Sequence, residues 1–139
     1  MWNLMLMILE GIPERFPDLD FVIQEAGIGW IPYWTWRLDD YYMTYTDETP
    51  MLTKLPNEYI EESFHFTSQP VGHTARNREH LAWAVEMAGP DSLMFSADLP
   101  HSDFDTPNEL FDRIKQHFDA DTVRGIMGET ADELYGLTS

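Results

Sequence analysis

Three short apolar segments, each followed by residues with helical spacing, constrain the fold of this chain more than any other feature. We expect strands near residues 19–25, 64–69 and 92–98, because each segment is partly β-branched or aromatic and ends at glycine, proline or acidic residues. Strand followed by helix, repeated three times, predicts an α/β fold with parallel strands.

Helices are predicted between and around these strands from apolar residues spaced three and four positions apart. Asn57 and Asn77 are candidate N-caps, and Gly125 and Gly128 weaken the last helix. The predicted helices are 2–14, 30–45, 57–63, 78–88, 107–118 and 121–135.

Three parallel strands cannot close a barrel, and a parallel sheet needs cover on both faces. We expect helices on the outer side and open outer strands. Because soluble proteins rarely leave such edges bare, we also expect self-association or pairing with another chain. Residues 1–139 therefore look like one partial domain.

The charge balance excludes some partners. Asp and Glu number 25 against 8 Lys and Arg, a net charge of −17 spread along the chain. Such a field repels phosphate, so we expect no nucleic-acid partner. The longest early apolar run is too short to span a bilayer and follows no Lys or Arg, so we expect no membrane partner and a cytoplasmic location. A halophilic source fits this charge; an ordinary acidic cytosolic protein is the alternative.

Carboxylates directly follow two of the predicted strands: Glu25 after the first and Asp98 after the third. The simpler interpretation of Asp98 is an acidic turn, and that of Glu25 is an exposed strand-end carboxylate. The alternative is a metal or proton-transfer site. With no cysteine in the chain, any metal would need His and carboxylate ligands.

Four segments together resemble the amidohydrolase-related family that includes aminocarboxymuconate-semialdehyde decarboxylase-like enzymes and metal-dependent TIM-barrel hydrolases. They are EGIPERFPDLDFVIQEAGIGWIPYWTWRLDDYY, LPNEYIEESFHFTSQP, MFSADLPHSDFDTPNEL and ADELYGL. The resemblance implies the C-terminal half of a (β/α)₈ barrel, in which function sits at the C-terminal ends of the strands.

The resemblance also implies roles for site residues. Asp98 falls where such enzymes place the last-strand aspartate, which binds metal or handles the proton of metal-bound water. Glu25 stands where the decarboxylase branch has a histidine, so its role as ligand, base or substrate contact stays open. The implied cofactor is a divalent metal, with zinc expected first and manganese as the alternative. The implied substrate is a small carboxylated molecule, which is hydrolysed or decarboxylated.

Four further residues are candidates, three of them with a structural alternative. His101 could reach the pocket mouth or be a solvated loop histidine. Arg37 could bind a substrate carboxylate, or pair with Asp39, Asp40 or another acid. Gln69 matches the family and could line the pocket, whereas Trp30 could form its wall or simply pack in the core.

The family's H-x-H metal motif, on the first strand of the barrel, is missing: no H-x-H occurs in residues 1–139. Three explanations stay open. The chain is an inactive half of a hydrolase or decarboxylase, an enzyme completed by a complementary N-terminal half, or a non-catalytic remnant that serves oligomerisation or binding.

The charge generates a first prediction. Raising NaCl from about 10 mM to about 1 M shortens the Debye length from about 30 Å to about 3 Å, so repulsion within the chain should weaken and the melting temperature should rise steeply. Calorimetry measures this, with an uncharged osmolyte such as sucrose as the control that does not screen charge. A melting temperature that is flat in salt would contradict the halophilic interpretation.

Overall fold

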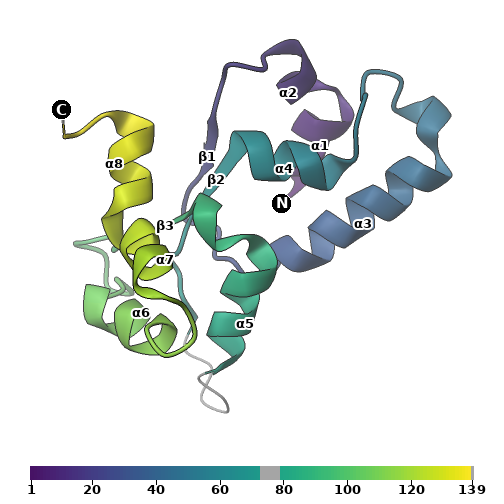
Figure 1. The fold of residues 1–139 in the computed structure, drawn as a ribbon. Coiled ribbons are helices and arrows are strands. Elements are labelled where there is room, and N and C mark those ends of the chain that lie inside the picture. Colours follow the sequence, from purple (N-terminus) through teal and green to yellow (C-terminus); the bar gives the residue numbers. More distant parts are fainter. Residues whose placement is uncertain (73–78, 139) are drawn as a thin grey trace.

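The computed structural model describes residues 1–72 and 79–138 and contains one three-stranded sheet flanked by helices (Figure 1). The strand order is β1-β2-β3, and both neighbouring pairs are parallel, which confirms the α/β prediction. The elements are α1 (Trp2–Leu9), α2 (Ile12–Arg15), β1 (Phe21–Ile23), α3 (Ile31–Thr44), η1 (Thr46–Glu48), α4 (Pro56–Ser63), β2 (Phe64–Thr67), α5 (Glu79–Ala88), η2 (Pro90–Ser92), β3 (Leu93–Met94), α6 (Pro107–Ile114), α7 (Ala120–Arg124), the π-helical turn η3 (Gly125–Glu129) and α8 (Thr130–Tyr135).

Strand register gives the sheet one strongly apolar face. Phe21 lies opposite Phe64, and Phe66 lies opposite both Ile23 and Leu93. Since side chains alternate along a strand, these residues share a face, and all of them belong to or pack against the main hydrophobic core. The other face carries Val22, His65, Thr67 and Met94.

The strands are shorter than predicted, because backbone pairing ends before the apolar pattern does. Beyond β3, the Phe95 N–H donates to the carbonyl of Ile126 at 2.7 Å, so the side of the chain that faces away from β2 bonds to η3. The expectation of two bare edges therefore needs correction at β3. Within the described residues β1 pairs with β2 alone, so self-association through that edge stays a prediction.

The first predicted helix, 2–14, is broken in the structure. Gly11 separates α1 from α2 and has a φ of +67°. A Cβ at this position would lie 2.5 Å from Cβ of Met51, so the close approach of residue 51 also requires glycine. Spacing of apolar residues alone could not reveal that contact.

Helices α4 and α6 both begin with a proline and with a glutamate that caps the first turn. Pro56 and Pro107 occupy the first turns of α4 and α6, and a glutamate three residues after each cap accepts a hydrogen bond from the cap N–H. Leu55 N donates to Glu58 at 2.7 Å, and Thr106 N donates to Glu109 at 3.0 Å. The predicted Asn57 cap is therefore wrong, because Asn57 lies inside α4; the Asn77 cap lies outside the described residues.

The C-terminal helices are also more divided than predicted. α6 ends at Ile114 and not at 118. The predicted helix 121–135 is divided into α7, η3 and α8, and the backbone at Gly128 inside η3 is not helical. The sequence had weakened this prediction at Gly125 and Gly128.

In the described part of the chain, no helix is long and apolar enough to cross a membrane.

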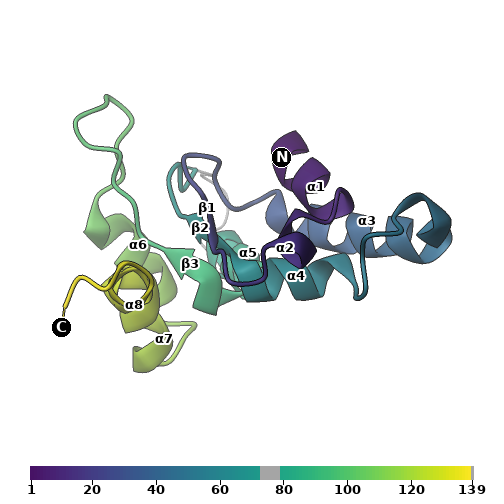
Figure 2. The ribbon, with the colours of Figure 1, turned by 90° about the horizontal axis from the view of Figure 1, so that it is seen from above.

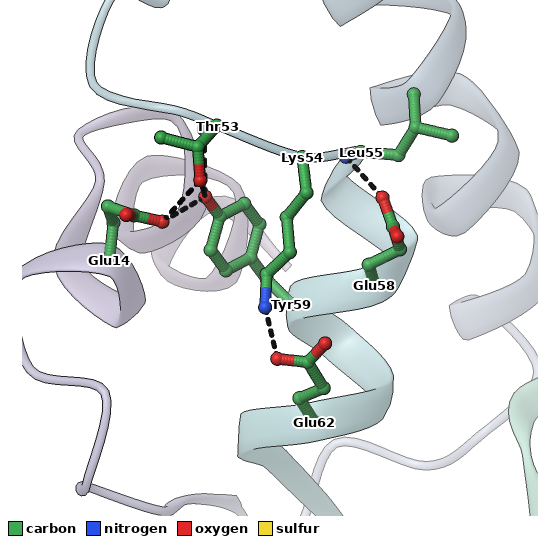
Figure 3. A network of polar contacts seen from close by, with 7 residues as sticks. All are labelled: Glu14, Thr53, Lys54, Leu55, Glu58, Tyr59 and Glu62. Atoms are coloured by element: carbon green, nitrogen blue, oxygen red, sulfur yellow. Dashed lines mark hydrogen bonds and ion pairs between the residues drawn. The ribbon is translucent and has the colours of Figure 1, made fainter.

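A polar network ties α2 to α4 (Figure 3). Glu14 accepts hydrogen bonds from the Tyr59 hydroxyl and from Thr53 Oγ1, the latter at 3.0 Å. The Tyr59 and Thr53 hydroxyls hold the pKa of the Glu14 carboxyl below its ordinary value. Lys54 lies over the Tyr59 ring, 4.5 Å from its centroid, and pairs with Glu62. These contacts hold the loop before α4 against the N-terminal helices.

The turn at Gly11 generates a second prediction. Gly11→Ala should destabilise the protein by about 2–4 kcal/mol, because it adds a left-handed backbone cost of about 1–2 kcal/mol to the overpacking against Met51. Gly136→Ala is the matched control, since Gly136 has a φ of +61° but nothing within 4 Å of its would-be Cβ. Urea denaturation of both variants measures the difference; equal losses would contradict the close contact at Gly11.

Candidate functional site at the carboxyl ends of the strands

The predicted site residues lie just past the strands, at one edge of the sheet. Glu25 follows the end of β1 by two residues, Gln69 follows β2 by two, and Asp98 follows β3 by four. Because the strands are parallel, these three exits leave the sheet on the same side, and the loop from β3 to α6 projects there (Figure 2).

Backbone conformation singles out the two carboxylates. In the described residues, positive φ at a non-glycine residue occurs at Glu25, with φ 53°, and at Asp98, with φ 56°. A left-handed conformation costs a non-glycine residue about 1–2 kcal/mol and persists where the surrounding structure holds it. The surrounding structure therefore holds both carboxylates in an uncommon backbone conformation, which is rarer for Glu than for Asp.

Side chains at the carboxyl end of β2 accept hydrogen bonds from the segments that follow β1 and β3. The Glu25 N–H donates to Thr67 Oγ1 at 3.1 Å, and the Ser96 N–H donates to Ser68 Oγ at 3.2 Å. Thr67 and Ser68 are both buried. Their hydroxyls therefore fix the start of each turn that carries a carboxylate. Sequence reasoning missed Ser68, because only the strand register reveals which backbone group its hydroxyl meets.

Asp98 and His101 form a hydrogen-bonded pair. His101 Nδ1 lies 2.7 Å from Asp98 Oδ1, and the His101 N–H donates to the Asp98 carbonyl at 3.0 Å. The Asp98 side chain is 14% exposed, whereas that of His101 is 69% exposed. The carboxylate is thus held in the turn while the imidazole extends toward solvent.

The charge around His101 favours its protonated form. The hydrogen bond to Asp98, and then the charge of Asp98, raise the pKa of His101, with smaller contributions from Glu25 and Asp103. The Glu25 and Asp98 carboxylates therefore act on the pKa of His101 in the same direction. With Asp98 ionised, Nδ1 donates to the carboxylate, which leaves Nε2 to exchange protons with a bound molecule or water.

The other predicted site residues make structural contacts. Gln69 is buried, and its backbone carbonyl accepts from the Gly27 N–H at 3.3 Å. Trp30 Nε1 donates to the Ala26 carbonyl at 2.8 Å, and its ring meets Phe66 edge-on at 6.0 Å. Arg37 is exposed and pairs with Asp40 at 2.5 Å, which is the ion-pair alternative. Substrate contact by these three residues stays a prediction.

The described residues do not by themselves fit a complete metal site. Among residues 1–72 and 79–138 no group of three or more His, Asp or Glu side chains is placed to hold an ion. Glu25 and Asp98 offer oxygen ligands, but a catalytic zinc ordinarily takes three protein ligands, and His101 already directs Nδ1 to Asp98.

The Asp98–His101 contact generates a third prediction. Asp98→Asn should lower the pKa of His101 toward its ordinary value of 6.5, because it removes the largest cause of the rise. Since the folded pKa lies above the unfolded one, this contact stabilises the fold below the unfolded pKa, and that stabilisation is lost as pH rises through the folded pKa. NMR titration of the imidazole measures the pKa, with the signal assigned by His101→Gln.

Asp103→Asn is the matched control for this titration, because Asp103 makes the smallest of the named contributions. It should shift the pKa of His101 much less than Asp98→Asn does. Equal shifts from the two variants would show that the general negative field, and not the 2.7 Å contact, controls His101.

Comparison with known structures shows that the fold of this chain is similar to part of larger enzymes. The fold is similar to that of 5-carboxyvanillate decarboxylase LigW from Sphingomonas paucimobilis, with a TM-score of 0.76 and 29% identity over 98% of this chain and 39% of that one. A dihydroxybenzoic acid decarboxylase from Polaromonas sp. JS666, solved with bound manganese and the inhibitor 2-nitroresorcinol, gives a TM-score of 0.70 and 21% identity over 96% and 39%. An amidohydrolase from Mycobacterium avium subsp. paratuberculosis gives 0.74 and 23% over 94% and 32%.

These likenesses confirm that the three-stranded unit corresponds to part of a larger barrel. The chain spans about 39% of the length of the first of these solved relatives. A comparison with curated proteins gives no significant match. The amidohydrolase family model matches residues 3–137, nearly the whole sequence. This chain therefore belongs to the amidohydrolase family.

Proposed function

We propose that this chain forms part of a metal-dependent amidohydrolase-type barrel that decarboxylates or hydrolyses a small carboxylated substrate. The observation that carries the proposal is the pair of left-handed carboxylates at the strand exits, Glu25 and Asp98, with His101 bonded to the second. Decarboxylation is the first candidate, because LigW, at 29% identity, is a decarboxylase of a carboxylated aromatic acid.

The chemistry assigned to this chain is proton handling. Decarboxylation replaces a departing CO₂ with a proton at carbon, and hydrolysis removes a proton from water. The pair of Asp98 and His101 suits decarboxylation, because the raised pKa of His101 keeps a proton on Nε2 that can be delivered to carbon, and the Asp98 carboxylate orients the ring through Nδ1. In hydrolysis, the Asp98 carboxylate would instead accept the proton that water loses. Glu25 adds a second negative charge beside them.

A divalent cation belongs to the proposal as a component of the complete barrel. The solved Polaromonas decarboxylase carries manganese, and the sequence resemblance implies zinc. Glu25 and Asp98 are the oxygen ligands that this chain offers, and the remaining ligands would come from the rest of the barrel. We therefore expect little turnover from residues 1–139 alone.

The alternative is a non-catalytic binding or oligomerisation module. It is supported by the incomplete ligand set of the described residues and by Glu25, which stands where the sequence resemblance implies a histidine. The two functions differ in one respect: only the enzyme needs the acid–base capacity of Asp98.

The test combines this chain with a complementary barrel segment and manganese or zinc, and follows CO₂ release from carboxylated hydroxybenzoates. Asp98→Asn should lower turnover by about 10²–10⁴-fold while assembly is unchanged, because the amide keeps the shape but can neither take up a proton nor hold His101 in its protonated form. Glu25→Gln should cost as much if Glu25 binds the metal, and less if it contacts substrate.

Asp112→Asn is the control for these variants, because Asp112 is an exposed carboxylate on α6 paired with Lys115. It should leave turnover unchanged. Full activity of the Asp98→Asn assembly, or tight stoichiometric metal binding with turnover by this chain alone, would contradict the proposal.

A further inference from the structure

The loop between β3 and α6 has an exposed tip and a buried base. Residues 99–104 are all exposed, and the loop projects from the rest of the chain in Figure 2. At the base, Asp105 is 1% exposed, and among the described residues it is the one acidic or basic side chain that is buried. The proton handling proposed above does not use this carboxylate, so its burial has another physical reason.

Asp105 joins the two ends of the loop and ties them to the segment that follows β2. Its N–H donates to the carbonyl of Ala97 at 3.0 Å, which closes the loop directly before Asp98. Its Oδ2 accepts from the N–H of Val71 at 2.8 Å. The first bond brings the ends of the loop together, and the second fixes them to the neighbouring strand exit.

The segment after β2 also contacts the turn that carries Glu25. The Gly27 N–H donates to the carbonyl of Gln69 at 3.3 Å, two residues before Val71 along the chain. Residues 69–71 therefore bond to both carboxylate-bearing segments. Asp105 is a side chain that connects the second of these segments to the first through residues 69–71.

The cost of burying Asp105 indicates that the bond to Val71 has a use. Removing a charged side chain from water carries a large free-energy penalty, whereas a charge-assisted hydrogen bond is shorter and stronger than a neutral one. Because residues 99–104 are exposed, burial of apolar side chains contributes little to holding them in place. A strong bond at the base is therefore well placed to restrict the loop.

We propose that Asp105 is a positioning residue for the Asp98–His101 pair. Its carboxylate fixes the base of the loop, so that Asp98 Oδ1 and His101 Nδ1 keep their 2.7 Å contact although His101 is exposed. Without this bond the loop takes up several conformations, and the pair forms for only part of the time. The catalytic consequence rests on the function proposed above, whereas the effect on the loop does not.

Amide hydrogen exchange, measured by NMR on the complete chain without metal or substrate, tests this role. The His101 N–H donates to the Asp98 carbonyl at 3.0 Å and therefore reports on the turn that carries the pair. Asp105→Ala should raise the exchange rate of this N–H by about tenfold or more, because the acceptor at the base is lost and the loop opens locally. Asp105→Asn should restore most of the protection, because its amide oxygen can accept the same bond.

Val85→Ala is the control for a general loss of stability, because Val85 is fully buried on α5, outside the loop. It should accelerate exchange of the core amides and leave the His101 N–H unchanged, since amides in loops exchange through local opening. If circular dichroism shows that Asp105→Ala is unfolded, Asp105→Ser, whose side chain is one atom shorter than that of Asp, takes its place.

An unchanged exchange rate of the His101 N–H in Asp105→Ala or Asp105→Ser would overturn the proposal. Equal acceleration by Asp105→Asn and Asp105→Ala would overturn it as well, because loss of the charge and not of the bond to Val71 would then explain the effect. None of these outcomes involves turnover. Failure of the positioning role is therefore distinct from failure of the proposed function, which the activity of the Asp98→Asn assembly decides.

Discussion

Hydrogen bonding of β2 to a strand on each side is the constraint on which the rest of the structure depends. β2 is the middle strand, paired in parallel with β1 and β3, and the carboxyl ends of both neighbours are set by its register. The same segment continues this role past its last paired residues, where the hydroxyls of Thr67 and Ser68 accept backbone N–H groups from the two flanking turns. One strand therefore positions both carboxylate-bearing exits.

Glu25 and Asp98 have the positive φ that glycine has elsewhere in the described residues. Turns with positive φ are ordinarily made by glycine, and this chain uses glycine for that purpose at Gly11 and Gly27. At Glu25 and Asp98 it has instead a carboxylate held at a conformational cost. Asp adopts the left-handed region more readily than most residues do, so the conformation costs less at Asp98 than at Glu25.

Charge and aromatic residues give the surface two distinct regions. The acidic residues are distributed along the chain and give it a strongly negative field, which suits solvation in salt and opposes close approach of similar molecules. The exposed aromatic residues of α1 and α3, Trp2, Tyr33 and Trp36, lie in stretches of sequence without charged residues.

Much of this protein was accessible from its residues. Short β-branched and aromatic segments bounded by turn residues predicted three parallel strands, and four motifs predicted the amidohydrolase family, which the family match confirms. The strand-end positions of Glu25 and Asp98 were also predicted, because parallel strands place their carboxyl ends together.

Contacts between residues far apart in sequence were decided only by the tertiary structure. The break at Gly11 depends on a close approach of Met51, the end of β3 depends on the carbonyl of Ile126, and the hydrogen bond at Ser68 depends on register with Ser96. Local propensity carries no information about such partners. The sequence by itself determined which segments form strands and which of them are followed by carboxylates. Only the tertiary structure decided which side chains fix the backbone at those carboxylates. The reason is that hydrogen bonds between neighbouring strands join residues that no local pattern relates.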